Sequence, residues 1–282
     1  MTENKRLFRI SSFAYIDLPL QDAVERLTRE GWTAIEIVCE GTHREILDWT
    51  DEQIGDMAAF GTERDIRWSV HAPIAGMNPC AGKEDLRKRS SELLVRTIRI
   101  AERLGRCSVV LHAGETDTEE DIHDSVHEKA ALERCVSFLE QTIRDTEDSG
   151  VMLALENTPP YPGRYGDDMR FIVEVVERIA SPRLKIVFDV GHSHIRGPGQ
   201  CIDALHRCRP HLAGLHLNDN YGREDEHRAV GDGTIPYEEI VRLLGNFGFS
   251  GDWVIEACSI GYAEASVDPL FQLRSRHALL SQ

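Results

Sequence analysis

The segments VMLALEN, at residues 151–157, and LKIVFDVG, at residues 184–191, are short apolar runs of the kind that forms buried β-strands. A longer segment with a helical pattern separates them. The order strand, helix, strand is typical of parallel strands joined by a crossover helix. These two runs therefore define the repeating unit of the fold.

The same unit repeats along the whole chain, with eight strand-like runs in all. They lie at residues 8–13, 34–38, 67–72, 108–114, 151–157, 184–191, 212–219 and 253–257. Amphipathic helical segments lie between them, for example at residues 84–104. A helix follows each run, and no Pro/Gly/Ser-rich linker or shift in composition interrupts the order. We therefore predict an α/β fold, a single (β/α)8 TIM barrel forming one domain over residues 1–282.

A doubly wound open sheet is the alternative fold. It would need a glycine-rich phosphate loop after the first strand, whereas SSFAYIDLPL, at residues 11–20, contains no glycine. The closed barrel is therefore favoured.

Composition narrows the classes of function. The 282 residues include 48 acidic and 32 basic side chains, and the formal net charge of −16 disfavours nucleic acid as a partner without excluding a local basic patch. No run reaches the ~18–20 apolar residues of a membrane span. The segment MTENKRLFRI, at residues 1–10, lacks the apolar stretch of a signal peptide, so we expect a cytoplasmic protein. The seven cysteines include no CxxC pair, which argues against a cysteine zinc site.

The ends of the strand-like runs carry the residues that could do chemistry, because the C-terminal strand ends form the active face of a TIM barrel. Seven acid–base or metal-ligating side chains stand at the ends of six consecutive runs: His71, His112, Glu156, Asp189, His192, His216 and Glu256. The loop YGREDEHRAVGDG, at residues 221–233, adds Asp225 and His227.

These side chains are expected to point into the barrel. Residues two apart on a strand share a face, so Glu156 lies on the face of the small Ala154, and His216 on that of Gly214. Four carboxylates gathered there would repel one another, and no lysine or arginine ends those strands. Imidazole and carboxylate together are the ligands of Zn, Mn, Co or Fe, which could supply the missing positive charge. Nine such residues exceed the needs of one ion and indicate two or three metals, ~3.5–4 Å apart.

The metal prediction depends on the joint pattern, because a lone histidine at a strand end is more often a structural hydrogen-bonding group. Asp225 and His227 are weaker candidates on the residues alone, since a charged loop is usually solvated. The other histidines outside the strand ends are expected at the surface: His43, His123, His127, His206, His211 and His277. Ser11 and Ser12 have no identifiable base nearby, which disfavours a serine nucleophile.

Seven segments resemble the xylose-isomerase-like TIM-barrel superfamily, which contains sugar and sugar-phosphate isomerases and epimerases as well as endonuclease IV. They are HAPI (71–74), LHAG (111–114), LENT (155–158), FDVGH (188–192), HLNDN (216–220), DEHRAVGDG (225–233) and VIEA (254–257). The resemblance runs from about residue 8 to residue 260. It implies the fold and a metal site, but not the substrate.

The ketose 3-epimerase branch implies one metal, Mn or a similar ion, and a histidine near the substrate at His192. The metal ligands carried over from that branch are Glu156, Asp189, His216 and Glu256. Glu156 and Glu256 would then exchange a proton on opposite faces of the sugar. Where those epimerases place an arginine four residues before the loop glycine, this chain has His227.

The endonuclease IV branch implies three zinc ions suited to phosphodiester hydrolysis, and its nine ligands map onto all nine residues named above. Two features of that branch are absent. The aromatic and the leucine that follow its third-strand histidine are replaced by Ile74 and Ala75, and its Asp-Thr-Cys-His run reads Asp-Val-Gly-His at residues 189–192.

The leading hypothesis is a divalent-metal-dependent isomerase or epimerase that abstracts a proton α to a carbonyl of a small sugar, sugar phosphate or related polyol ketone. Glu156, Glu256 and His192 are its predicted catalytic residues, with one to three Zn or Mn ions as cofactor and a small carbohydrate, not a membrane, as partner. An endonuclease IV-like zinc phosphodiesterase, a dehydratase or lyase on a cyclic polyol, and a barrel that binds metal without turnover stay open. Oligomeric state and substrate are left open, because loops such as residues 75–83 and 160–168 set specificity.

Overall fold

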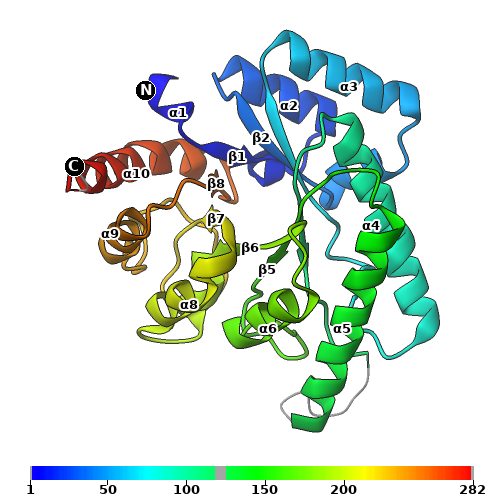
Figure 1. The fold of residues 1–282 in the computed structure, drawn as a ribbon. Coiled ribbons are helices and arrows are strands. Elements are labelled where there is room, and N and C mark those ends of the chain that lie inside the picture. The colour runs from blue at the N-terminus through cyan, green and yellow to red at the C-terminus, as the bar shows by residue number, and fades with distance from the viewer. Residues whose placement is uncertain (1, 118–124, 281–282) are drawn as a thin grey trace.

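The computed structural model describes residues 2–117 and 125–280. Eight parallel strands close into a barrel in chain order, and the helices surround it (Figure 1). The strands are β1 (Arg9–Ser11), β2 (Ala34–Val38), β3 (Arg67–His71), β4 (Val109–His112), β5 (Leu153–Glu156), β6 (Leu184–Asp189), β7 (Leu212–Leu217) and β8 (Asp252–Ile255). β1 pairs with both β2 and β8, which closes the sheet. The predicted (β/α)8 TIM barrel is confirmed.

The outer layer consists of helices, with short 3-10 turns (η) between some of them and the strands. The helices are α1 (Thr2–Lys5), α2 (Leu20–Arg29), α3 (Asp51–Glu63), α4 (Glu84–Arg103), α5 (Ser125–Asp145), α6 (Met169–Ile179), α7 (Val190–Ile195), α8 (Gln200–Cys208), α9 (Tyr237–Phe247) and α10 (Ile260–Leu280). The 3-10 turns are η1 (Ser12–Tyr15), η2 (Gly41–Leu47) and η3 (Arg209–His211). α4 matches the helix predicted over residues 84–104.

The strands separate two apolar regions. Outward side chains such as Leu155 and Leu215 belong to the large core under the helices, which also contains Trp32 and Phe188. Inside the barrel, three small apolar side chains form a separate cluster: Val110, Ala154 and Val187. This alternation leaves the inward positions nearer the strand ends to polar side chains.

Some strands end earlier than the apolar runs suggested, because side chains cap the turns that follow. The Asp189 carboxylate accepts a hydrogen bond from the backbone N–H of His192 at 2.7 Å, so α7 begins directly after β6. Similarly, Ser11 Oγ accepts a hydrogen bond from the backbone N–H of Phe13 at 3.3 Å, where η1 follows β1. β8 ends at Ile255, so Glu256 lies one residue beyond the strand.

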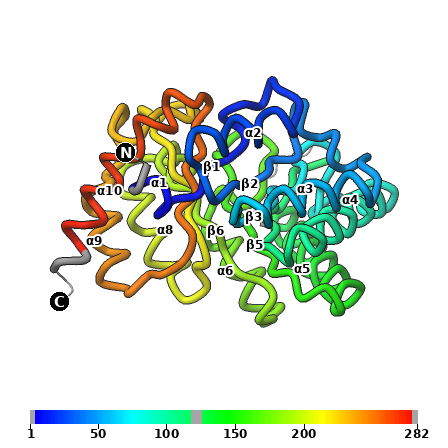
Figure 2. The backbone as a smooth tube through the Cα atoms, turned by 90° about the horizontal axis from the view of Figure 1, so that it is seen from above, coloured from blue at the N-terminus to red at the C-terminus, as the bar shows by residue number. Residues whose placement is uncertain are grey.

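The elements at the two ends of the described chain lie against one another, on the same side of the barrel (Figure 2). Lys5 of α1 forms an ion pair with Glu264 of α10 at 2.7 Å. Among the described helices, none is both long and apolar enough to cross a membrane.

The surface expectation was wrong for two histidines. His43 and His277 are buried. His43 Nδ1 lies 3.0 Å from Ser12 Oγ, so Ser12 does have a basic neighbour. Ser12 is itself fully buried and accepts a hydrogen bond from the backbone N–H of Val38, which indicates that this pair holds η2 against the barrel. His123 lies outside the described residues.

Candidate functional site

A cavity of ≈ 230 Å³ opens at the C-terminal ends of the strands. Seven of the nine predicted site residues line it: His71, His112, Glu156, His192, Asp225, His227 and Glu256. Phe13, Ile74 and Tyr161 contribute apolar and aromatic surface, and Arg164 is the one lysine or arginine among the described lining residues. The lining thus combines carboxylates and imidazoles with aromatic and apolar side chains.

The nine predicted residues gather in three groups, within each of which the candidate ligand atoms lie within 4.8 Å of one another. The first group is His71, His112 and Glu156; the second is Glu156, Asp189, His216 and Glu256; the third is His192, Asp225 and His227. Glu156 belongs to two groups. The predicted convergence at the barrel mouth is therefore observed, while the binding of metal by these residues stays a prediction.

Strand register explains the first two groups. His112 and Glu156 are direct neighbours on β4 and β5, and Asp189 and His216 are direct neighbours on β6 and β7. Glu156 lies between the groups: its Oε2 is 3.0 Å from Nε2 of His71, and its Oε1 is 2.9 Å from Nδ1 of His216. Glu256 reaches the same Nδ1 atom, at 3.2 Å.

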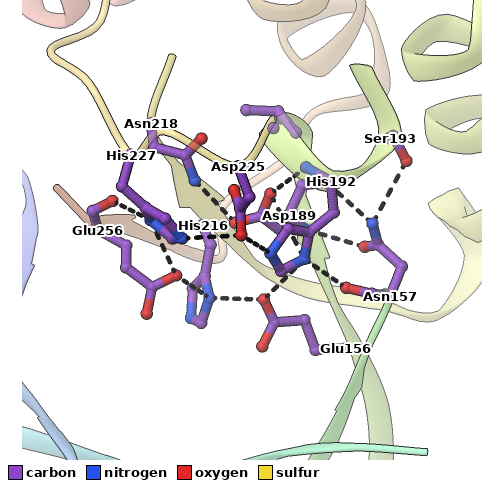
Figure 3. A network of polar contacts seen from close by, with 12 residues as sticks. Glu156, Asn157, Asp189, His192, Ser193, His216, Asn218, Asp225, His227 and Glu256 are labelled. Carbon is purple, nitrogen blue, oxygen red and sulfur yellow. Dashed lines mark hydrogen bonds and ion pairs between the residues drawn. The ribbon is translucent and has the colours of Figure 1, made fainter. Parts of the chain in front are cut away.

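The third group joins α7 to the loop between β7 and α9 (Figure 3). Asp225 Oδ2 lies 3.1 Å from Nε2 of both His192 and His227. The Asp219 carboxylate holds the far part of this loop, accepting hydrogen bonds from the backbone N–H groups of Gly231 and Ile235. His227 adopts a left-handed backbone conformation with a φ of 47°. Such strain in a non-glycine residue is often found at functional sites.

Three of the histidines are oriented by backbone carbonyls. Nδ1 of His71 lies 2.7 Å from the carbonyl oxygen of Ala72. The equivalent partners of His192 and His227 are the carbonyl oxygens of Asn157 and Glu256, at 2.7 and 2.8 Å. A carbonyl can only accept, so each Nδ1 carries a proton and each Nε2 faces the carboxylates. Histidines that bind metal ions are typically held in this way.

Asparagine side chains hold Asp189 in the second group (Figure 3). Asn157 exchanges two hydrogen bonds with the Asp189 backbone, accepting from its N–H at 2.9 Å and donating to its carbonyl oxygen at 3.0 Å. Asn218 Nδ2 donates to Asp189 Oδ2 at 2.9 Å. The backbone N–H of His192 donates to Asp189 Oδ1, so hydrogen bonds hold both oxygens of this carboxylate.

Buried carboxylates and imidazoles shift one another's protonation strongly. Burial favours the neutral form of Glu156, but His216 and His112 lower its pKa well below the usual range. Burial likewise opposes ionisation of Glu256, yet His216 and His227 lower its pKa to about 2. Burial alone would lower the pKa of His71, whereas its hydrogen bond to Glu156 and nearby carboxylates raise it to about 9. Burial, reinforced by Glu156, raises the pKa of Asp189 to about 6 despite His192.

The donor set fits divalent cations. Over residues 2–117 and 125–280, the carboxylates of Glu156, Asp189, Asp225 and Glu256 form ion-pair contacts with histidines but with no lysine or arginine. Three buried polar atoms in the groups, His112 Nδ1, His216 Nε2 and Asp225 Oδ1, make no hydrogen bond within the described chain. The carboxylates therefore attract protons to the imidazoles, and divalent cations could supply the same positive charge.

Sequence reasoning missed Glu36, a buried carboxylate within β2 whose Oε1 lies 3.0 Å from Nε2 of His216. A signal was present, because Glu36 is the only charged residue in the strand-like run AIEIV at residues 34–38. A charged side chain in a fully buried parallel strand needs a polar partner.

Comparison with known proteins identifies similar chains. The family described as xylose isomerase-like TIM barrel matches residues 24–272. The uncharacterized protein MJ1311 of Methanocaldococcus jannaschii is 30% identical over 264 residues, covering 93% of this chain and 87% of that protein. A probable endonuclease 4 of Thermotoga petrophila is 29% identical over 179 residues, covering 57% of this chain and 58% of its own.

Solved structures extend the comparison. A D-tagatose 3-epimerase-like protein superposes with a TM-score of 0.86 at 28% identity, covering 98% of this chain and 99% of its own. The IOLI protein, solved with a bound zinc atom, has a TM-score of 0.74 at 19% identity, with 97% of each chain covered. The second likeness concerns the fold alone.

Proposed function

This chain belongs to the xylose isomerase-like TIM-barrel family, and on that premise we propose that it is a divalent-metal-dependent epimerase or isomerase of a small sugar or related polyol ketone. The likeness to the D-tagatose 3-epimerase-like protein supports a sugar epimerase or isomerase. We further propose that a divalent metal ion is the cofactor, that the reaction is a proton transfer, and that the residues named below bind the ion and carry the proton.

The observation that carries the proposal is the meeting of two carboxylates at one atom. Glu156 Oε1 and Glu256 Oε2 approach Nδ1 of His216 to 2.9 and 3.2 Å, from the ends of β5 and β8. Epimerisation by proton transfer needs one group to remove a proton and another to return it. Two carboxylates near one point, both ionised at neutral pH because their pKa values are lowered, meet that need.

The second group would hold the cation through Glu156, Asp189, His216 and Glu256. Bound there, Zn or Mn would polarise a substrate carbonyl and so acidify the adjacent C–H. Glu156 and Glu256 would carry the proton to and from that carbon. His192, which lines the cavity, would hydrogen-bond the sugar, and the ring of Tyr161 would cover it.

Deuterium exchange tests this function. The protein, loaded with Mn or Zn, is incubated with a panel of ketoses in deuterium oxide, and label next to the carbonyl is followed by NMR. We expect exchange by the wild type and a loss of about 10²–10⁴-fold in Glu156→Gln and in Glu256→Gln. The exposed Glu63→Gln serves as control, and metal content is measured for each variant. Persistence of exchange in both metal-loaded active-site variants would refute the roles assigned to the two glutamates.

One observation favours a second function, zinc-dependent phosphodiester hydrolysis. A one-metal epimerase needs only the second group, whereas three groups are present and two of them share Glu156. The probable endonuclease 4 relative supports the same candidate. Incision of abasic duplex DNA by the zinc-loaded protein would establish this activity, and its absence, together with ketose exchange, would exclude it. Arg164 is the one lysine or arginine among the described residues that line the cavity, which favours the smaller substrate.

A further inference from the structure

Glu36 lies inside the barrel, one inward position deeper than the first group. It pairs in register with Ser69 on β3, and His71 follows two residues later on that strand. Its side chain is 1% exposed. The Ser69 hydroxyl donates to Glu36 Oε2 at 2.7 Å, which fixes one oxygen and directs the other across the barrel toward β7.

The second oxygen of Glu36 meets the imidazole of His216. Oε1 of Glu36 and Nε2 of His216 lie 3.0 Å apart, and both atoms are buried. The contact is an ion pair, and within the described chain neither atom makes a hydrogen bond. Leaving a buried polar atom unsatisfied is costly, so each is the partner that the other requires. Because an ionised carboxylate only accepts, the contact with Glu36 requires a proton on Nε2 of His216. Nδ1, which faces Glu156 and Glu256, is then the nitrogen that would give up its proton to a cation.

This arrangement makes His216 differ from three other site histidines. His71, His192 and His227 are held through Nδ1 by backbone carbonyls and present Nε2 to the carboxylates. His216 is reversed: Nε2 faces Glu36, and Nδ1 faces Glu156 and Glu256. A backbone carbonyl cannot be removed by mutation, but a side chain can, so the orientation of His216 is open to direct experiment.

We propose that Glu36 is a positioning residue for the second group: it holds the His216 proton on Nε2 and thereby directs the lone pair of Nδ1 to the cation. Ser69 in turn orients Glu36. The inference rests on the metal site of the proposed function, but it does not depend on sugar chemistry.

Metal affinity gives the first test. Zinc binding to wild type, Glu36→Met and Glu36→Gln is measured by competition with a chromophoric chelator. Methionine resembles glutamate in length but accepts no strong hydrogen bond, so we expect Glu36→Met to bind zinc about 10–100-fold more weakly. Glu36→Gln retains a carbonyl oxygen for Nε2–H and should restore most of the affinity. Equal binding by a folded Glu36→Met variant and the wild type would overturn the inference.

The position of the proton gives the second test, on the wild type itself. Histidine-selective ¹⁵N labelling of the zinc-loaded protein distinguishes the protonated ring nitrogen from the metal-bound one. We expect the His216 proton on Nε2 and zinc on Nδ1, and the reverse assignment would overturn the inference. Because this measurement uses the wild type, it tests the inference even if Glu36→Met fails to fold. Neither test requires turnover, so a protein that passes both but exchanges no ketose proton would refute the epimerase and leave the role of Glu36 intact.

Discussion

Gly191 packs against the side-chain amide of Asn218 so closely that no side chain fits between them. A Cβ atom on Gly191 would lie 2.0 Å from Oδ1 of Asn218. The same amide donates from Nδ2 to the Asp189 carboxylate. The position of the Asp189 carboxylate in the second group therefore depends on residue 191 having no side chain.

Replacement of Gly191 by alanine should displace Asn218 and disturb Asp189. We expect Gly191→Ala to lower the free energy of unfolding by about 1–3 kcal/mol through overpacking, and to weaken metal binding as well. Denaturant unfolding and a zinc titration measure the two effects. Gly55 offers a matched control, because it is a helical glycine with no atom within 4 Å of an added Cβ. Gly55→Ala should stabilise the protein by up to about 1 kcal/mol.

Removal of divalent cations should destabilise the folded protein. Without them, four partly or fully buried carboxylates face only imidazoles as positive partners among residues 2–117 and 125–280. A ligand present at about 100 times its dissociation constant adds about 2.7 kcal/mol of stability. We therefore expect a chelator to lower the melting temperature by several degrees and added Zn or Mn to restore it. An unchanged melting curve would argue against tight binding at any of the three groups.

Asp225 should control the protonation of the two histidines beside it. Burial lowers the pKa of His227, but the charge of Asp225 and its hydrogen bond raise it to about 9 in the metal-free protein. Asp225→Asn removes that charge, so the pKa of His227 should fall. NMR titration of both metal-free proteins measures the shift. An unchanged pKa would show that Asp225 and His227 do not form the contact described.

Stability should also depend on pH through His43, which contacts the Ser12 hydroxyl and backbone groups of Tyr15 and Leu18. Burial lowers its pKa from 6.5 to about 4, so below pH 6.5 the unfolded chain binds a proton that the folded protein does not. His43 therefore reduces the free energy of unfolding as the pH falls from 6.5 toward 4, by up to about 1.4 kcal/mol per pH unit. Urea unfolding of wild type and His43→Gln at pH 7 and pH 5 isolates this contribution. The loss between the two pH values should be smaller in the variant.

The sequence predicted the barrel because eight apolar runs alternate with helices, and a parallel strand buried on both faces reads as such a run. It also predicted the convergence of the nine polar residues, since the C-terminal ends of all eight strands meet at one mouth. Strand ends were less predictable. Val190 and Gly191 read as strand, but the Asp189 carboxylate caps a helix there, a contact that no apolar pattern reveals.

Partners across the barrel could not be read from the sequence. Glu36 and His216 are separated by 180 residues and contact one another only because β2 and β7 face the same interior. His43 likewise contacts Ser12, which lies in a different turn. Alternation tells which way a side chain points, but not which side chain it meets.

Metal stoichiometry tests the central claim most directly. The protein is dialysed against Zn or Mn, freed of excess ion and analysed for metal per chain, beside a sample treated with chelator. We predict one to three ions per chain that the chelator removes, with fewer ions in Glu156→Ala because Glu156 serves two groups. A folded wild-type protein that retains no ion under these conditions would contradict the account.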